Sequence, residues 1–278
     1  MGNGISIVTD STAVLTADDL KKYEIHVVPL KVIFGEEAYN EGKDISNEEF
    51  YRRLSQGETP TTSHPSEEDF IEVYRKLVDE GKAILSIHTP SKLSGTVSTA
   101  QAARAKFPEA EIEIIDSLTI GLGMLILPAV QAAAKGSSLA QIRESIERLN
   151  ASIYTIGTLN TLNYLRRGGR IGRARALLGS MLRIKPLLSF REGEVEILGK
   201  ARTTSRAIRE IADFVGRNVE GDAPIYAAVV YTSDSKPALS LKDELQSRFN
   251  CAELDLLQLG PVLGTHIGPG FFGIGFYC

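Results

Sequence analysis

The sequence predicts an α/β fold composed of an N-terminal α/β domain with a parallel sheet and a C-terminal α+β domain with an antiparallel sheet. Short apolar runs alternate with capped helical segments up to about residue 151, a pattern typical of parallel strands joined by right-handed helical crossovers. Further along, Glu192-Gly193 separates two strand-like runs and favours a tight hairpin between antiparallel strands. A length of 278 residues suits one large domain or two moderate ones.

The N-terminal half begins with a short apolar strand that ends at a polar cluster, Thr9-Asp10-Ser11-Thr12. Such clusters are typical where a parallel strand passes into a helix. Three helix starts have capping-box spacing, which satisfies free backbone N–H groups: Ser46-x-x-Glu49, Ser66-x-x-Asp69 and Ser138-x-x-Gln141. The predicted strands are 5–8, 83–87 and 112–115, and the predicted helices are 17–23, 47–55, 67–80, 98–106, 122–135 and one from 139 onward.

The C-terminal half changes to a pattern of hairpins and glycine-rich strands backed by helices. Its predicted strands are 153–158, 185–190, 194–200, 226–231, 253–258, 261–266 and 271–277, and its predicted helices are 205–219 and 236–248. We expect domains of about 1–151 and 152–278. No low-complexity linker separates the two halves, so we expect a close interface with the site in the cleft between them.

The composition is that of an ordinary folded protein, with 43% hydrophobic and 24% charged residues. A net charge of −4 gives no general affinity for nucleic acid, and no nucleic-acid partner is expected. The two cysteines, Cys251 and Cys278, offer neither a disulfide framework nor the repeated spacing of a zinc site. The N-terminus lacks a signal core, and the apolar stretch 119–134 is too short to cross a bilayer, so we expect a cytoplasmic protein.

Four polar segments follow predicted strands, at the edge where open α/β sheets bind ligands. They are 9–11, 61–66, 91–96 and 116–117. Each alone is explained by the preference for Ser, Thr and Asp at helix caps and turns. Together they place hydroxyls and free N–H groups along one rim, which suits a carboxylate or a phosphate.

The second half carries more apolar side chains than its predicted strands and helices obviously need, although core packing is the commoner use of such residues. They are Leu177, Leu178, Met181, Leu182, Ile184, Leu187, Leu188, Phe271, Phe272, Ile274 and Phe276. The segment 264–270 is rich in glycine, so we expect a loop that holds His266 at a fixed place, in either a structural or a functional role.

A local basic cluster spans 166–175 and continues at Lys200, Arg202, Arg206 and Arg209. It is either a solvated helix face or a docking surface for an acidic protein or a phosphorylated ligand. The sequence lacks a phosphate-binding P-loop, a dinucleotide fingerprint and a nucleophile elbow, and it offers no metal-ligand spacing; no cofactor and no metal are expected.

Taken together, these motifs resemble the DegV family of bacterial fatty-acid-binding proteins along the whole chain. Five stretches carry the resemblance: VTDST at 8–12, PTTSHPS at 60–66, SKLSGT at 91–96, LNYLRRGGRI at 162–171 and GPVLGTHIGPG at 260–270. The family usually has Gln before the proline of the second stretch, where this chain has His64.

The resemblance implies the same two-part fold and no ATP site of its own. It also implies one long-chain fatty acid bound between the domains, and a role as the acyl-binding subunit of a fatty acid kinase that serves phospholipid synthesis. The partner kinase would phosphorylate the bound carboxylate to an acyl phosphate, and the carrier would touch the membrane surface transiently.

Carried over residue by residue, the resemblance places the carboxylate ligands on Thr62 and Ser94, with Gly95 beside Ser94 and His266 in the same network. Thr61 and Ser63 are neighbouring candidates. The resemblance also places Arg173 and Arg202 on the kinase-facing surface.

Two rival hypotheses use the same residues. In the first, the protein is a serine acyl hydrolase with Ser94 as nucleophile, His266 as base and Asp10 or Asp116 as the orienting acid. In the second, the hydroxyl-rich rim binds a phosphate or a nucleotide and the protein is a regulator.

Overall fold

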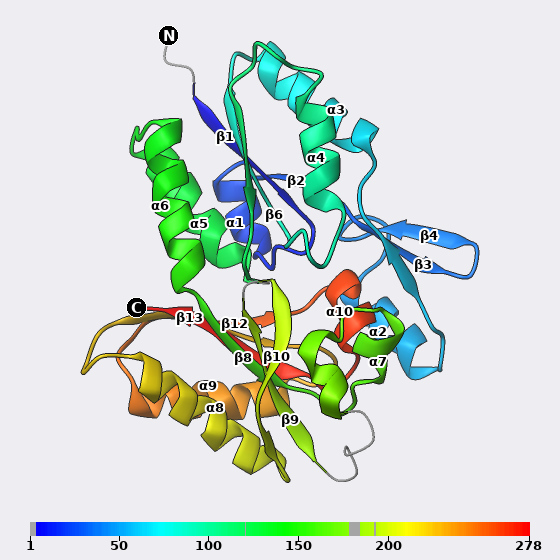
Figure 1. Cartoon of the computed structure of the whole chain (residues 1–278), viewed down its shortest axis with the longest axis vertical. Helices are drawn as coiled ribbons and strands as arrows, with labels where there is room; N and C mark the ends of the chain where they lie inside the picture. The colour runs from blue at the N-terminus through cyan, green and yellow to red at the C-terminus, as the bar shows by residue number, and fades with distance from the viewer. Residues whose placement is uncertain (1–3, 120, 178–183, 192) are drawn as a thin grey trace.

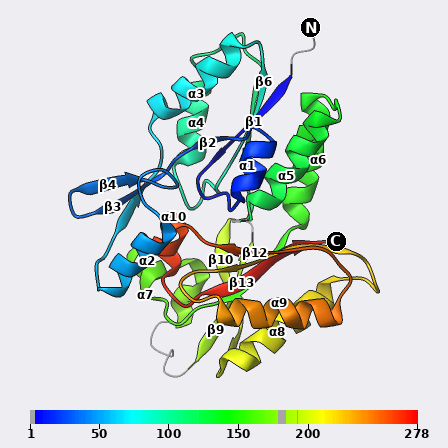
Figure 2. The same ribbon diagram turned by 180° about the vertical axis from the view of Figure 1, so that it is seen from behind.

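The computed structural model of the chain describes residues 4–119, 121–177, 184–191 and 193–278. Two lobes lie one above the other (Figure 1). The upper lobe contains a parallel sheet between helices, and the lower lobe contains a larger sheet with two helices on its outer face (Figures 1 and 2). In the described parts of the chain, no helix is both long and apolar enough to span a bilayer. The predicted fold class is confirmed.

The upper lobe is built on a four-stranded sheet whose neighbouring strands are all parallel. Its strands, in spatial order, are β2 (His26–Val28), β1 (Ile5–Asp10), β6 (Ala83–His88) and β7 (Ile112–Asp116). The helices α3 (Glu67–Asp79) and α4 (Thr96–Arg104) pack on one face, and α5 (Gly123–Ala134) and α6 (Leu139–Ser152) pack on the other. Every residue of β6 is buried, as expected for a central strand covered on both faces.

The predicted helix starts are present. Ser66 and Ser138 close complete capping boxes with Asp69 and Gln141, whereas Ser46 caps α2 (Asn47–Ser55) alone. The short helix α1 (Ala17–Lys22) also begins with a complete capping box, between Thr16 and Asp19. These caps satisfy backbone donors that would otherwise lack partners at the surface.

The lower lobe contains a six-stranded sheet that is antiparallel except for one parallel pair at its edge, β11 with β12. Its strands, in spatial order, are β10 (Glu194–Ala201), β9 (Lys185–Arg191), β8 (Tyr154–Thr158), β13 (Phe272–Tyr277), β11 (Ile225–Tyr231) and β12 (Cys251–Gln258). The helices α8 (Thr204–Asn218) and α9 (Lys236–Arg248) cover one face. The predicted β9–β10 hairpin is confirmed, with Gly193 at a φ of 80°, while position 192 lies outside the described residues.

A third, small sheet was not predicted. It contains β4 (Glu37–Asn40), β3 (Lys31–Phe34) and β5 (Thr61–Ser63), all antiparallel, and in Figure 2 the β3–β4 hairpin projects from the side of the molecule. Strands of three or four residues are too short for an alternating pattern to stand out. Together with α2, this sheet encloses a core that includes Val262 from the far end of the chain.

The prediction of a strand at 261–266 is wrong, because this segment is the helix α10 (Pro261–Ile267). Pro261 occupies its first turn, and Gly268 follows its end with a φ of 79°, which is the usual asymmetry of helix ends. A side chain at Gly264 would strike Phe50, so α10 lies close against α2. His266 is therefore held by a helix and not by a loop. The domain boundary near 151 stays a prediction.

Candidate functional site

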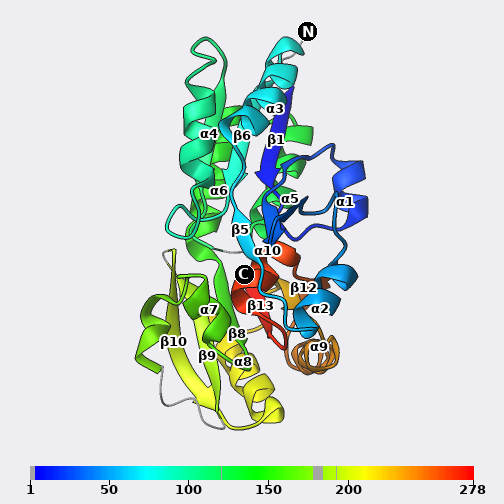
Figure 3. The same cartoon turned by 90° about the vertical axis from the view of Figure 1, so that its right-hand side faces the viewer.

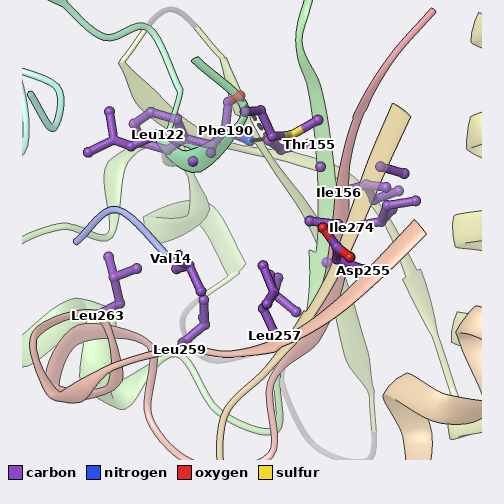
Figure 4. Close-up of a pocket in the computed structure, with 18 of the residues that line it drawn as sticks. Val14, Leu122, Thr155, Ile156, Phe190, Asp255, Leu257, Leu259, Leu263 and Ile274 are labelled. Atoms are coloured by element: carbon purple, nitrogen blue, oxygen red, sulfur yellow. Dashed lines mark hydrogen bonds between the residues drawn. The ribbon is translucent and has the colours of Figure 1, made fainter. Parts of the chain in front are cut away.

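A cavity of about 210 Å³ lies between the upper lobe and the face of the six-stranded sheet that α8 and α9 leave uncovered. Leu122 and Phe190 line one wall in Figure 4, and Val14, Leu257 and Leu263 line the other. Further apolar lining comes from α5 and the sheet, namely Met124, Leu127, Ile156, Leu188, Val230, Phe271 and Ile274. A slot of this kind suits an elongated apolar ligand.

Glycines in β13 let side chains of other elements pack against the cavity face of the strand. Phe272, Ile274 and Phe276 belong to the core beneath α8 and α9, so the intervening Gly273 and Gly275 present no side chain on the opposite face. A Cβ atom at Gly275 would lie 3.1 Å from the Met124 sulfur, across the cavity.

Of the apolar residues singled out from the sequence, Leu188 and Phe271 line the cavity, and Ile274 both borders the cavity and belongs to the core beneath α8 and α9. Leu187, Phe272 and Phe276 pack in the core instead. Leu178, Met181 and Leu182 lie outside the described residues.

The two ends of the cavity differ in polarity. At one end, Leu263 and Ile267 of α10 and Leu165 of α7 (Asn163–Arg167) form an apolar wall. At the other end, the lining becomes polar, with Asp19, Gln131, Glu253 and Asp255. The chain from Glu253 to Leu259 covers roughly 20 Å, at ~3.3 Å per residue of strand, so the cavity is long enough for an extended acyl chain.

His266 is on the last turn of α10, directly before Ile267, which lines the apolar end of the cavity. His266, Thr62 and Ser94 are not themselves among the lining residues. The Nε2 atom of His266 is 2.8 Å from the Thr62 hydroxyl of β5, so the structure brings together two of the predicted ligands that are 204 positions apart in the sequence. Its Nδ1 atom is buried without a hydrogen-bond partner, against Gly168. A side chain at Gly168 would collide with the imidazole, so a glycine is needed there.

Burial and, to a smaller extent, the nearby Arg170 guanidinium together lower the pKa of His266 to about 4. The imidazole is therefore neutral at pH 7. An unpartnered buried N–H is costlier than an unpartnered lone pair, so the geometry favours the tautomer with the proton on Nε2. In that tautomer His266 donates to Thr62, and the Thr62 hydroxyl proton is free to donate to a ligand.

The segment around Ser94 is tied to the same region by two contacts. The Arg170 guanidinium donates to the Leu93 carbonyl at 2.9 Å and to the Gly168 carbonyl at 2.5 Å, which links this loop to the glycine beneath the imidazole. Gly95 lies against the ring of His64, where any side chain would clash. The Ser94 hydroxyl is 2.8 Å from the Thr96 hydroxyl.

The remaining candidates from the β5 motif point elsewhere. Thr61 is exposed, and the Ser63 hydroxyl donates to the carbonyl of the next residue at 3.1 Å. Alternation along β5 accounts for this, because Thr62 faces α10 and its two neighbours face the other way. The packing of His64, a departure from the usual family motif, against Gly95 was not predicted, because the two residues are far apart in the sequence.

The hydrolase hypothesis is not supported by the geometry. Asp10 is buried and accepts from Thr12 and Thr89, and its Oδ2 atom lies 3.2 Å from His88 Nδ1. Asp116 accepts from Ser91 at 2.8 Å. Within the described residues, therefore, neither acid hydrogen-bonds to His266.

A different serine, histidine and aspartate do form a hydrogen-bonded chain, but it is sealed in the core. Ser86 Oγ lies 2.6 Å from His88 Nε2, and His88 reaches Asp10 on the neighbouring strand. All three side chains are fully buried, so this chain ties β1 to β6 and has no access to a substrate. Across the residues that the structure describes, no group of three or more His, Cys, Asp or Glu is arranged to hold a metal ion.

Arg173 and Arg202 lie on adjoining elements of the lower lobe. Arg173 is in the 3₁₀ helix η1 (Gly172–Leu177) and forms a 3.3 Å ion pair with Glu194, and its side chain is 70% exposed. Arg202 is exposed directly after β10, the strand that η1 packs against. Both arginines are therefore available at the surface, next to β10. This strand is an edge of the six-stranded sheet, and Figure 3 shows it on the side of the lower lobe away from α9.

A family model described as "Uncharacterised protein, DegV family" matches residues 4–278. The chain belongs to the DegV family. A DegV domain-containing protein of Streptomyces coelicolor is 36% identical over 99% of this chain and 98% of its own length.

Solved DegV structures share the whole fold. A DegV family protein from Thermus thermophilus, described as fatty acid binding, superposes with a TM-score of 0.94 at 36% identity, covering 99% of each chain. DegV of Bacillus subtilis, described as a fatty acid binding protein, superposes with a TM-score of 0.90 at 31% identity, again covering 99% of each chain.

Proposed function

We propose that this DegV protein binds one long-chain fatty acid between its lobes and presents the carboxylate to a partner kinase, which phosphorylates it to an acyl phosphate. The observation that supports this most directly is the apolar cavity, one end of which is formed by the helix carrying His266. The fatty acids bound by related DegV proteins fit the same chemistry.

The acyl tail supplies the affinity. Each buried methylene contributes about 0.8 kcal/mol, so a chain of about 15 methylenes offers about 12 kcal/mol. Association and ordering consume about 4–15 kcal/mol of this. Net binding is therefore favourable only if the slot exists before the ligand arrives, and the structure contains an apolar cavity of about 210 Å³ between the lobes.

The head-group site supplies orientation. The hydroxyls of Thr62 and Ser94 are the proposed donors to the carboxylate, with His266 holding the Thr62 hydroxyl in place. The opposite end of the cavity carries Asp19, Glu253 and Asp255, which repel a carboxylate. A fatty acid inserted with its carboxylate at this end would be repelled by these negative charges, so the acidic end favours the opposite orientation.

Phosphoryl transfer requires ATP from another protein in this proposal, because the proposed site uses its donors to hold the carboxylate. The exposed Arg173 and Arg202 are the proposed contacts for the kinase, whose surface would be acidic there. A cytoplasmic location, service to phospholipid synthesis and a transient membrane contact that loads the lipid belong to the same proposal.

Denaturing mass spectrometry of the purified protein, with gas chromatography of the extracted lipid, tests the binding step. We expect about one fatty acid per chain, either co-purified or after loading with palmitate. Protein that carries no fatty acid under any loading condition would refute the proposal.

A further inference from the structure

Glu41 places a carboxyl group inside the protein, at the point where the small sheet meets the start of α10. The residue follows β4, and only 5% of its surface is exposed. Its Oε1 atom accepts the backbone N–H of Val262 at 2.8 Å, across 221 positions of sequence. A side chain at Gly260 would clash with the same oxygen, so that glycine makes room for the carboxyl.

The contact is reinforced on the other side of Pro261. The Tyr51 hydroxyl donates to the Leu259 carbonyl at 2.9 Å. Tyr51 of α2 therefore holds the chain immediately before α10. Glu41, which follows the small sheet, holds the first turn of the helix. His266 follows Val262 by four positions, one turn along the same short helix.

Stability alone does not account for this carboxyl. Its second oxygen, Oε2, is buried without a hydrogen bond of good geometry, and burying such an atom is unfavourable. Burial raises the pKa of Glu41 to about 7, although the Ser11 hydroxyl and the Val262 amide partly oppose that rise and the nearby Asp10 adds to it. An apolar residue of similar volume would avoid the cost, which indicates that the carboxyl serves the placement of α10.

We propose that Glu41 is a positioning residue for the head-group site: by accepting the Val262 N–H, it holds α10 where His266 meets Thr62. This inference rests on the proposed function and assigns a further residue to the same site. Glu41 is not one of the residues that line the cavity, so it acts through the helix.

Substitutions of Glu41 that separate reach from charge test the inference. Glu41→Gln keeps the length and an acceptor oxygen, Glu41→Asp keeps the charge but is shorter by one methylene, and Glu41→Ala removes both features. Glu36→Ala, at an exposed position in the β3–β4 turn, is the control. Two quantities are measured: the Kd for palmitate by titration of delipidated protein, and the imidazole NMR signal of His266 across a pH titration.

We expect Asp and Ala to weaken palmitate binding about tenfold, as for the loss of one buried hydrogen bond, and to move the His266 pKa upward toward its usual value. The signals of the buried His88 should stay in place. Gln and the control should remain within about twofold of the parent protein. If Ala does not fold, the comparison of Asp with Gln still decides the matter.

The inference is overturned if folded Asp or Ala variants leave both the Kd and the His266 signal unchanged, or if Gln is as damaging as Asp. A parent protein that binds no palmitate would instead overturn the proposed function. In that case the role of Glu41 would be tested by the NMR titration of His266 alone, compared between the variants and the parent protein.

Discussion

Replacing Gly275 with valine tests whether the acyl tail lies over β13. The new side chain would project into the cavity toward the Met124 sulfur, which lies 3.1 Å from the position of the added Cβ. Met124 is flexible and can move aside, and valine is favoured in strands, so the fold should tolerate the change.

The magnitude follows from the volume that valine takes from the ligand. Three added carbons displace about three methylenes of the tail, and at about 0.8 kcal/mol each the loss is about 2.4 kcal/mol. Palmitate binding should therefore weaken about 60-fold. The head-group contacts of Thr62 and His266 lie on other elements and should be unaffected.

Titration calorimetry of delipidated protein with palmitate measures the effect, and Gly199→Val serves as the matched control. Gly199 also lies in a strand, and its added Cβ would meet only the Leu187 side chain at 3.6 Å, an ordinary contact outside the cavity. The reasoning fails if Gly275→Val has the melting temperature of the parent and binds palmitate with a Kd within twofold of it.

Three further predictions concern the head group, the kinase surface and a buried acid. Thr62→Val keeps the shape but removes the hydroxyl, so palmitate affinity should fall about tenfold while affinity for palmitate methyl ester changes less; equal losses would contradict the assignment. Arg173→Ala and Arg202→Ala should leave the lipid content unchanged but slow acyl phosphate formation by a purified bacterial fatty acid kinase catalytic subunit. Arg148→Ala, an exposed control on α6, should change neither the lipid content nor the rate. Loss of lipid in the Arg173 or Arg202 variant would contradict their assignment to the kinase-facing surface. The pKa of Glu41 is about 7 in the folded state and about 4.3 in the unfolded state, so the folded state binds the proton more tightly. The free energy of unfolding should therefore fall by up to about 3 kcal/mol as the pH rises from 4.5 through 7. Urea denaturation across that range should show a flatter profile for Glu41→Gln, and identical profiles would contradict the burial effect.

Local signals in the sequence were sufficient for three strands of the parallel sheet and for its helices, but not for the three-residue edge strand β2. Ser66 and Ser138 mark helix starts that the structure confirms, because a capping box involves only neighbouring residues. The α10 helix was missed because its seven residues are too few to show a helical repeat, and its helical state depends on packing against α2. Propensity is a weak guide for segments this short.

The head-group site was only partly predictable for the same reason. The motifs identified Thr62 and His266, but their contact spans 204 positions and depends on the small sheet that was not predicted. The contribution of Gly168, which makes room for the imidazole, had no local signal beyond its glycine-rich setting. Glu41 carried none, because a lone acid after a short polar strand is indistinguishable from a surface residue.

If the protein binds a fatty acid as proposed, the chemistry of the head-group site favours presenting the carboxylate to a kinase over simply storing the fatty acid. An arginine paired with the carboxylate would add the attraction of a full opposite charge and a bidentate geometry to the hydrogen bonds, and would bind it more tightly. Yet Arg170, the nearby cation, is committed to the carbonyls of Leu93 and Gly168, and His266 is neutral. A carboxylate held only by hydroxyl donors keeps more of its negative charge on oxygen and remains a better nucleophile toward a phosphoryl group. Because the tail supplies the affinity, the head group can be held weakly enough to react.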